Sequence, residues 1–171
     1  MKENPRYEKF VEWVIKKAGS DTGFRAHMAR ADNPDTEYQS WPYLVNFGID
    51  LALDQQRLPY TLIGAAICKA KIERDGAYGL GKALSSCMMQ SDKEESQSNP
   101  RLRRLLACSS VQETCRVLRP LLALINDKAT RKLSYAQLLN DLALFSLNDK
   151  RVKLRWARDF YSSESPEEAR Q

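Results

Sequence analysis

Apolar residues recur at helical spacing along most of the chain. The first stripe begins directly after an Asn4-Pro5 pair, which is typical of a helix start. Its members are Tyr7, Phe10, Val11, Val14 and Ile15. We find no stretch with the two-residue alternation of a strand, and glycine and proline number only seven each. The pattern therefore predicts an all-α fold.

Further helices follow from turn residues and caps. We expect them at about 22–31, 41–47, 60–74 with Pro59 at the start, and from a glycine-rich turn at 76–81 to about residue 90. Four more are expected in residues 99–161, each beginning at a cap: Asn99, Ser110 with Glu113, Ser134 with Gln137, and Asn148 or Asp149.

A polar run without any apolar residue, 91–98, separates two helical halves. We therefore expect a two-lobed helical bundle of about eight to nine helices. Its parts are an N-terminal half (1–90), a polar loop (91–98), a basic C-terminal half (99–161) and a disordered tail (162–171).

The charge is distributed unevenly between the halves. The net charge is +5, yet residues 1–98 carry 13 basic and 14 acidic groups, whereas residues 99–161 carry 13 basic and 5 acidic groups. Because a localised positive field attracts polyanions, we expect nucleic acid as the partner of the C-terminal half.

Several function classes lack the residues they need. The chain has a single histidine, His27, and four cysteines without C-x-x-C spacing, which disfavours a metal site or a histidine-based triad. The first residues are polar and the longest apolar stretch is far below the ~20 residues of a membrane span. We expect a cytoplasmic protein with no catalytic residue, no metal, no cofactor, no small-molecule substrate and no membrane partner.

The segment from Gly76 to Lys82 fits the first positions of a phosphate-binding P-loop. The next residue is Ala83, which lacks the hydroxyl that binds magnesium, and the preceding residues are typical of a charged helix end rather than a strand. A nucleotide-using enzyme therefore remains a minor alternative, and the glycines are better explained by close packing between helices.

Basic residues of the C-terminal half recur on helix faces opposite the apolar stripes. The pairs and rows are Arg101 with Arg104, Arg116 with Arg119, and Arg151 with Arg155 and Arg158, flanked by Lys150 and Lys153. Few carboxylates balance them, unlike on an ordinary solvated face. Trp13, Trp156 and Phe160 fall on apolar stripes, so we find no aromatic platform for stacking bases and expect contacts to the sugar-phosphate backbone.

The order of several short motifs resembles the CasB family, the small subunit of the type I-E CRISPR effector Cascade. The motifs are Trp13 followed by 23–31 (GFRAHMARA), 80–84 (LGKAL), 101–106 (RLRRLL), 117–122 (VLRPLL), 133–139 (LSYAQLL), 150–153 (KRVK) and 156–160 (WARDF). Together they cover about residues 10–161.

This resemblance implies a non-catalytic, two-lobed helical subunit that binds guide RNA and the target and displaced DNA strands. It also implies other Cascade subunits and a second copy of the chain as partners. With Arg104 from the face pattern, the expected nucleic-acid-binding residues are Arg30, Lys82, Arg101, Arg104, Arg119, Lys150, Arg151 and Lys153. The alternative is a helical DNA-binding transcription regulator, which needs a recognition helix with Asn or Gln among its exposed residues.

Overall fold

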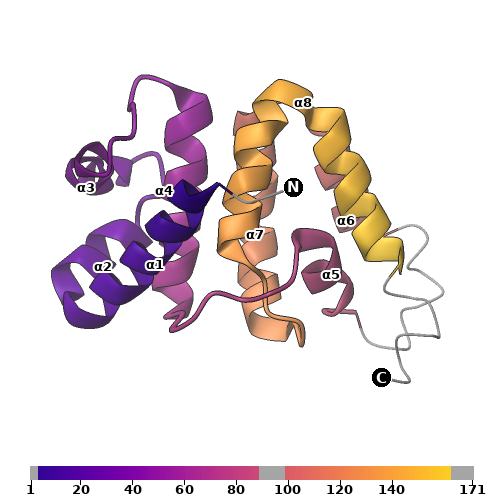
Figure 1. Cartoon of the computed structure of the whole chain (residues 1–171), viewed down its shortest axis with the longest axis horizontal. Coiled ribbons are helices and arrows are strands. Elements are labelled where there is room, and N and C mark those ends of the chain that lie inside the picture. The colour runs from indigo at the N-terminus through magenta and orange to yellow at the C-terminus, as the bar shows by residue number, and fades with distance from the viewer. Residues whose placement is uncertain (1–3, 89–98, 163–171) are drawn as a thin grey trace.

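A computed structural model describes residues 4–88 and 99–162. Within these two ranges the chain forms eight α-helices and a short 3-10 helix, and no strand (Figure 1). The all-α class predicted from the sequence is confirmed. The expected loop at 91–98 and nearly all of the expected tail lie outside the described residues, so the division of the chain there stays a prediction.

In the N-terminal half the first two helices pack on the last one, and a 3-10 helix packs between the second and third helices. Its elements are α1 (Pro5–Ser20), α2 (Thr22–Ala29), η1 (Glu37–Ser40), α3 (Trp41–Asn46) and α4 (Asp54–Ala70). Asn4 caps α1 as predicted, since its side chain accepts a hydrogen bond from Arg6 N at 3.1 Å. Phe10 lies at the centre of an aromatic cluster, with the rings of Tyr60 and Phe47 edge-on at 4.7 and 5.1 Å.

The start of α4 differs from the prediction. We expected Pro59 to open this helix, but α4 begins five residues earlier and holds Pro59 inside it. Arg57 explains the extra turn, because its side chain donates to the carbonyl oxygen of Leu51 and pairs with Glu37 and Asp54. These tethers hold the backbone helical ahead of the proline, which therefore does not set the boundary.

The end of α4 also comes earlier than residue 74. Lys71 adopts the left-handed conformation (φ 51°), and Ile72 N donates to Ile67 O at 3.1 Å. This six-to-one hydrogen bond is that of a Schellman motif, which terminates a helix. After Lys71 the chain therefore leaves α4 and crosses to the C-terminal half.

The glycine segment after this crossing is a packing element. Gly76 N and Tyr78 N donate to the carbonyl oxygens of Leu133 and Lys132 at 3.1 Å, so these amides are occupied rather than available to a phosphate. The glycine at position 81 lies in α5 (Leu80–Ser85), where a Cβ atom would overlap the carbonyl oxygen of Trp156 in α8. The packing explanation is confirmed. The predicted helix to residue 90 is wrong, because α5 ends at Ser85 in a turn with i to i−3 hydrogen bonds.

The C-terminal half consists of α6 (Pro100–Leu106), α7 (Val111–Lys128) and α8 (Tyr135–Ser162). The predicted caps Asn99 and Ser110 accept backbone N–H groups of α6 and α7 at 3.0 to 3.1 Å. The two last helices of the prediction are one bent element, α8, whose backbone is non-helical at Asn148 (φ −156°, ψ 77°).

Helices α1 and α4 join the halves, because α4 packs on α7 and α8 and α1 packs on α8. In Figure 1, α4 and α7 lie side by side in the middle, with α1 to α3 on one side and α5, α6 and the second arm of α8 on the other. Helix α5 falls within the predicted N-terminal half (1–90) but packs mainly on α8. The buried apolar side chains of both halves form one continuous core.

Candidate nucleic-acid interface

The bend of α8 positions its basic arm, which runs from Asp149 to Ser162. Asn148 accepts a hydrogen bond from Arg151 N at 3.1 Å and so starts a new helical arm. Val152, Trp156 and Phe160 are buried, as predicted for Trp156 and Phe160. The helical period therefore leaves Lys150 and Arg151 exposed and Lys153 half-buried.

Lys153 carries a partly compensated charge. Its Nζ lies 2.9 Å from Asp149 Oδ2 and 5.5 Å from the centre of the Phe145 ring. The hydrogen bond from Lys153 lowers the pKa of the Asp149 carboxyl. Lys150, by contrast, has no carboxylate partner in residues 4–88 and 99–162, so it presents its full charge to solvent.

Helix α6 brings further cations close to this arm. Leu102 and Leu105 are buried, while Arg101, Arg103 and Arg104 are exposed and form no ion pair within the described part of the chain. Burial, followed by the negative charge of Glu113, raises the pKa of the Cys108 thiol, whereas the positive charges of Lys153 and Arg104 lower it. A cavity of about 330 Å³ lies between the helices, lined by Leu106, Asp149, Lys150, Lys153, Leu154 and Ala157.

Lys82 belongs to the same end of the molecule. It projects from α5, the helix whose Gly81 is in tight contact with the α8 backbone. Six of the predicted site residues therefore lie on three neighbouring helices, α5, α6 and α8 (Figure 1). These are Lys82, Arg101, Arg104, Lys150, Arg151 and Lys153.

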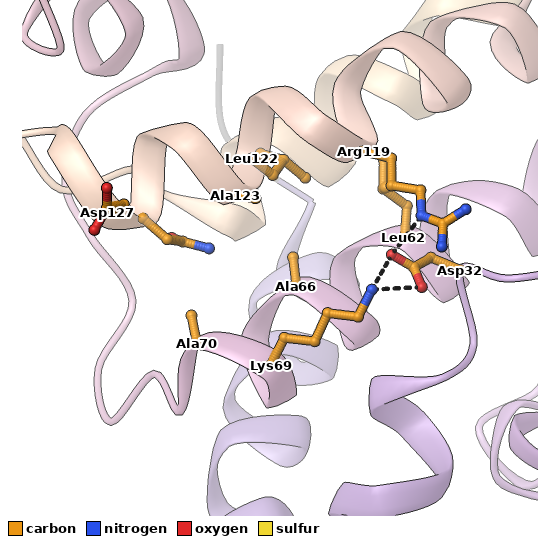
Figure 2. Close-up of a pocket in the computed structure, with 10 residues that line it drawn as sticks. Asp32, Leu62, Ala66, Lys69, Ala70, Arg119, Leu122, Ala123 and Asp127 are labelled. Carbon is orange, nitrogen blue, oxygen red and sulfur yellow. Dashed lines mark hydrogen bonds and ion pairs between the residues drawn. The ribbon is translucent and has the colours of Figure 1, made fainter.

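Arg30 and Arg119 form a second group, away from the first. Arg30 follows α2, and its Nη1 lies 3.5 Å from Gln39 Oε1. Arg119 projects from α7 toward Asp32, with Nε 3.3 Å from Oδ2 (Figure 2). Asp32 lies two residues after Arg30, so Arg119 contacts the turn that follows α2.

One member of the predicted row of arginines, Arg155, is placed differently, while Arg151 and Arg158 are exposed. Arg155 does not present its charge to solvent with Arg151 and Arg158; its guanidinium donates to the buried carboxylate of Asp141. Arg158 pairs with Asp159 at 2.9 Å. Neither residue was among the expected binding residues, and the structure gives both a partner within α8.

Residues 4–88 and 99–162 also bear on metal binding and membrane crossing. We find no group of three or more histidine, cysteine or acidic residues arranged to hold a metal ion there. Within the same ranges no helix combines the length and apolar character that crossing a membrane requires. His27 is exposed, with Nδ1 3.2 Å from the Tyr43 hydroxyl.

Comparison with known proteins decides the family. A sequence model described as "CRISPR-associated protein Cse2" matches residues 24–161 of this chain. This chain belongs to the CRISPR-associated Cse2 family. A curated member from Thermus thermophilus is 26% identical over 165 residues, which cover 94% of this chain and 93% of the relative. The resemblance to the CasB family drawn from the motifs is confirmed by this model match and the curated relative, and solved CasB structures share the fold.

Solved structures of Cse2 and CasB proteins have the same architecture. A Cse2-family protein from Thermus thermophilus superposes with a TM-score of 0.71 at 22% identity, covering 91% of this chain and 97% of that one. M. ruber CasB gives 0.69 at 21% identity, covering 96% and 97%. A chain of a solved "CRISPR RNA-guided surveillance complex" gives 0.67 at 18% identity, covering 93% and 92%.

The sequence pattern did not indicate a role for two charged residues of this Cse2 chain. Lys69 and Asp32 form an ion pair of 2.6 Å, although 37 residues separate them. No periodicity links positions so far apart, because the pairing depends on how α2 packs against α4. From the sequence, Lys69 is only a cation near a helix end.

Proposed function

We propose that this Cse2-family chain is a non-catalytic subunit of a Cascade-type CRISPR surveillance complex. In that role it binds the sugar-phosphate backbones of the guide–target hybrid and of the displaced strand, and so stabilises the R-loop. Its partners are guide RNA, target and displaced DNA, the other subunits and a second copy of itself. Family membership and the shared fold with a chain of an RNA-guided surveillance complex support this proposal.

The observation that carries the proposal is the set of exposed cations without carboxylate partners on α6 and α8. Arg101, Arg104 and Lys150 lie on exposed faces, and no acidic side chain within the described ranges neutralises them. Arginine suits phosphate because its planar fork donates two parallel hydrogen bonds. A surplus of this kind supports binding to a polyanion.

The proposed contacts carry no sequence information. Trp156 and Phe160 are buried, and the exposed face of the second α8 arm has neither Asn nor Gln after its cap. In an RNA-guided complex, base pairing with the guide reads the sequence, so the protein needs only to hold backbones. Opening the duplex is close to energetic balance, so a few phosphate contacts are enough to favour the open state.

The test is target binding by the reconstituted complex across a salt series, with and without this chain. We expect the chain to co-purify with the complex, to tighten target binding and to steepen the salt dependence. A triple variant, Arg101→Ala, Arg104→Ala and Lys150→Ala, is expected to flatten the slope of log affinity against log salt by roughly 0.9 per lost contact. Lys9→Ala, an exposed lysine of α1, is the matched control.

Two results would contradict the proposal. One is a chain that neither joins the complex nor changes target affinity. The other is a triple variant that binds target like the wild type at every salt concentration. Selection from random DNA adds a check on the regulator alternative, because enrichment of a palindrome would favour a recognition helix over backbone binding.

A further inference from the structure

Three elements meet at the carboxylate of Asp32. This residue lies in the turn after α2, and its side chain is only 7% exposed. Lys69 Nζ, from α4, lies 2.7 and 2.6 Å from its two oxygens, and Arg119 Nε, from α7, lies 3.3 Å from Oδ2. Figure 2 shows both cations converging on this one carboxylate.

The cluster carries a surplus positive charge toward solvent. The side chains of Lys69 and Arg119 are 47% and 45% exposed, whereas the carboxylate between them is buried. One negative charge is therefore matched by two positive ones, and the positive groups are the accessible ones. A desolvated carboxylate restricts the rotamers of both long side chains, so less conformational entropy is lost when they bind an anion.

Both cations keep donors for another acceptor. Arg119 uses Nε toward Asp32, and its two terminal nitrogens donate to no group within residues 4–88 and 99–162. The ammonium of Lys69 has three N–H donors, and Asp32 accepts at two positions. A tetrahedral phosphate offers several acceptor oxygens and fits such a pair of donors.

Open space flanks the cluster on both sides. A cavity of about 340 Å³ between α4 and α7 has Lys69 and Arg119 at one end and an apolar lining of Leu62, Ala66 and Leu122. A second cavity of about 470 Å³ is lined by Arg57, Arg116 and Arg119 among others. On the side of the second cavity, Arg116 adds a cation next to the cluster, whereas Arg57 is paired with Glu37 and Asp127 lines the first cavity.

We propose that Lys69 and Arg119 together bind one backbone phosphate at the junction of α4 and α7, and that Asp32 is a positioning residue for this site. The inference rests on the proposed function, and it adds Lys69 and Asp32 to the residues expected from the sequence. It also extends the nucleic-acid interface to α4, in the half of the chain without surplus positive charge.

The first test uses the full chain and a fluorescein-labelled 30-nucleotide single strand of mixed sequence. Anisotropy titrations run from 50 to 200 mM salt. Lys69→Ala is expected to weaken binding about tenfold or more at low salt, as for one lost charged hydrogen bond, and to lower the salt slope by roughly 0.7. Lys69→Arg is expected to restore most of the affinity. Lys128→Ala, an exposed lysine of α7, is the matched control.

Asp32→Asn separates positioning from simple electrostatics. Removal of a negative charge beside two cations tightens binding if Asp32 only masks them. If Asp32 positions them, the variant binds about threefold or more weakly and Asp32→Glu recovers part of the loss. Tighter or unchanged binding by Asp32→Asn, with a native-like unfolding midpoint, overturns the positioning role. Wild-type affinity in Lys69→Ala overturns the phosphate site.

These failures are distinct from failure of the proposed function. If the wild-type chain neither binds the strand nor strengthens target binding in the complex, the nucleic-acid role itself is wrong. If the wild type binds and the Arg101, Arg104 and Lys150 triple variant does not, while Lys69→Ala binds normally, only the α4–α7 site is lost.

Discussion

Removal of the Asp141 carboxylate is expected to be the most damaging single change in the C-terminal half. Asp141 is 1% exposed and lies in the first arm of α8. It accepts hydrogen bonds from Arg155, and from Trp156 Nε1 at 2.7 Å, both in the second arm. Asp141→Ala leaves a largely buried guanidinium and a buried indole N–H without this acceptor. Loss of one partner of a buried ion pair costs about 3–5 kcal/mol.

Urea unfolding followed by circular dichroism measures this loss. With a slope near 2 kcal/mol per molar urea, the midpoint is expected to fall by roughly 2 M. Asp127→Ala, which removes an exposed partner of Lys128, is the control and is expected to change the stability by less than about 0.5 kcal/mol. The double variant Asp141→Leu with Arg155→Met removes both charges and is expected to recover part of the stability, because the buried Trp156 N–H still lacks its acceptor.

A loss of less than about 1 kcal/mol in Asp141→Ala would refute this reasoning, since a buried pair should cost several times more. Such a result would mean that water or a neighbouring acceptor replaces the carboxylate, and that packing alone holds the bend. A double variant no more stable than Asp141→Ala would refute the part of the argument that assigns the cost to an unpaired buried charge.

Two further predictions concern packing and pH. Gly81→Ala places a Cβ atom against the α8 backbone, 2.8 Å from Phe160 N, and is expected to cost about 1–3 kcal/mol in thermal or urea unfolding; Gly19→Ala, which has open space, is expected to be neutral or stabilising. Burial raises the pKa of Tyr135 to about 12 from 10. The neutral, buried Tyr135 phenol therefore contributes its full stabilisation to the folded state below pH 10. This stabilisation is lost as the pH rises through 12, and the loss is about 1.4 kcal/mol by pH 11. Tyr135→Phe is expected to reduce the stability loss between about pH 9 and 11 by this amount, and an unchanged slope would contradict the linkage.

Local signals were enough for most helix starts. The caps Asn4, Asn99 and Ser110 act within three residues, so the sequence alone contains the information. The errors arose where distant residues decide a boundary. Helix α4 starts before Pro59 because Arg57 is held by Glu37, twenty residues earlier in the chain. Such tethers have no local sequence signature.

In the candidate site, too, some residues follow from local sequence signals and others depend on distant residues. Helical periodicity placed Arg101, Arg104 and Lys150 on exposed faces, because period and burial follow from the apolar stripe. It also placed Arg155 on such a face, since periodicity cannot reveal a buried carboxylate fourteen residues earlier. The pairing of Lys69 with Asp32 needed the tertiary structure.

The Asp75 carboxylate lies where the chain crosses between the halves, and we expect it to make their unfolding cooperative. It accepts hydrogen bonds from Tyr135 N at 2.6 Å, Ala136 N at 3.2 Å and the Ser134 hydroxyl at 3.2 Å, about sixty residues later in the chain. The first turn of α8 thus depends on a residue that arrives from α4. Separation of the halves would remove the acceptor from that turn and the donors from a half-buried carboxylate at the same moment. We therefore expect the two halves to unfold in a single transition rather than one after the other.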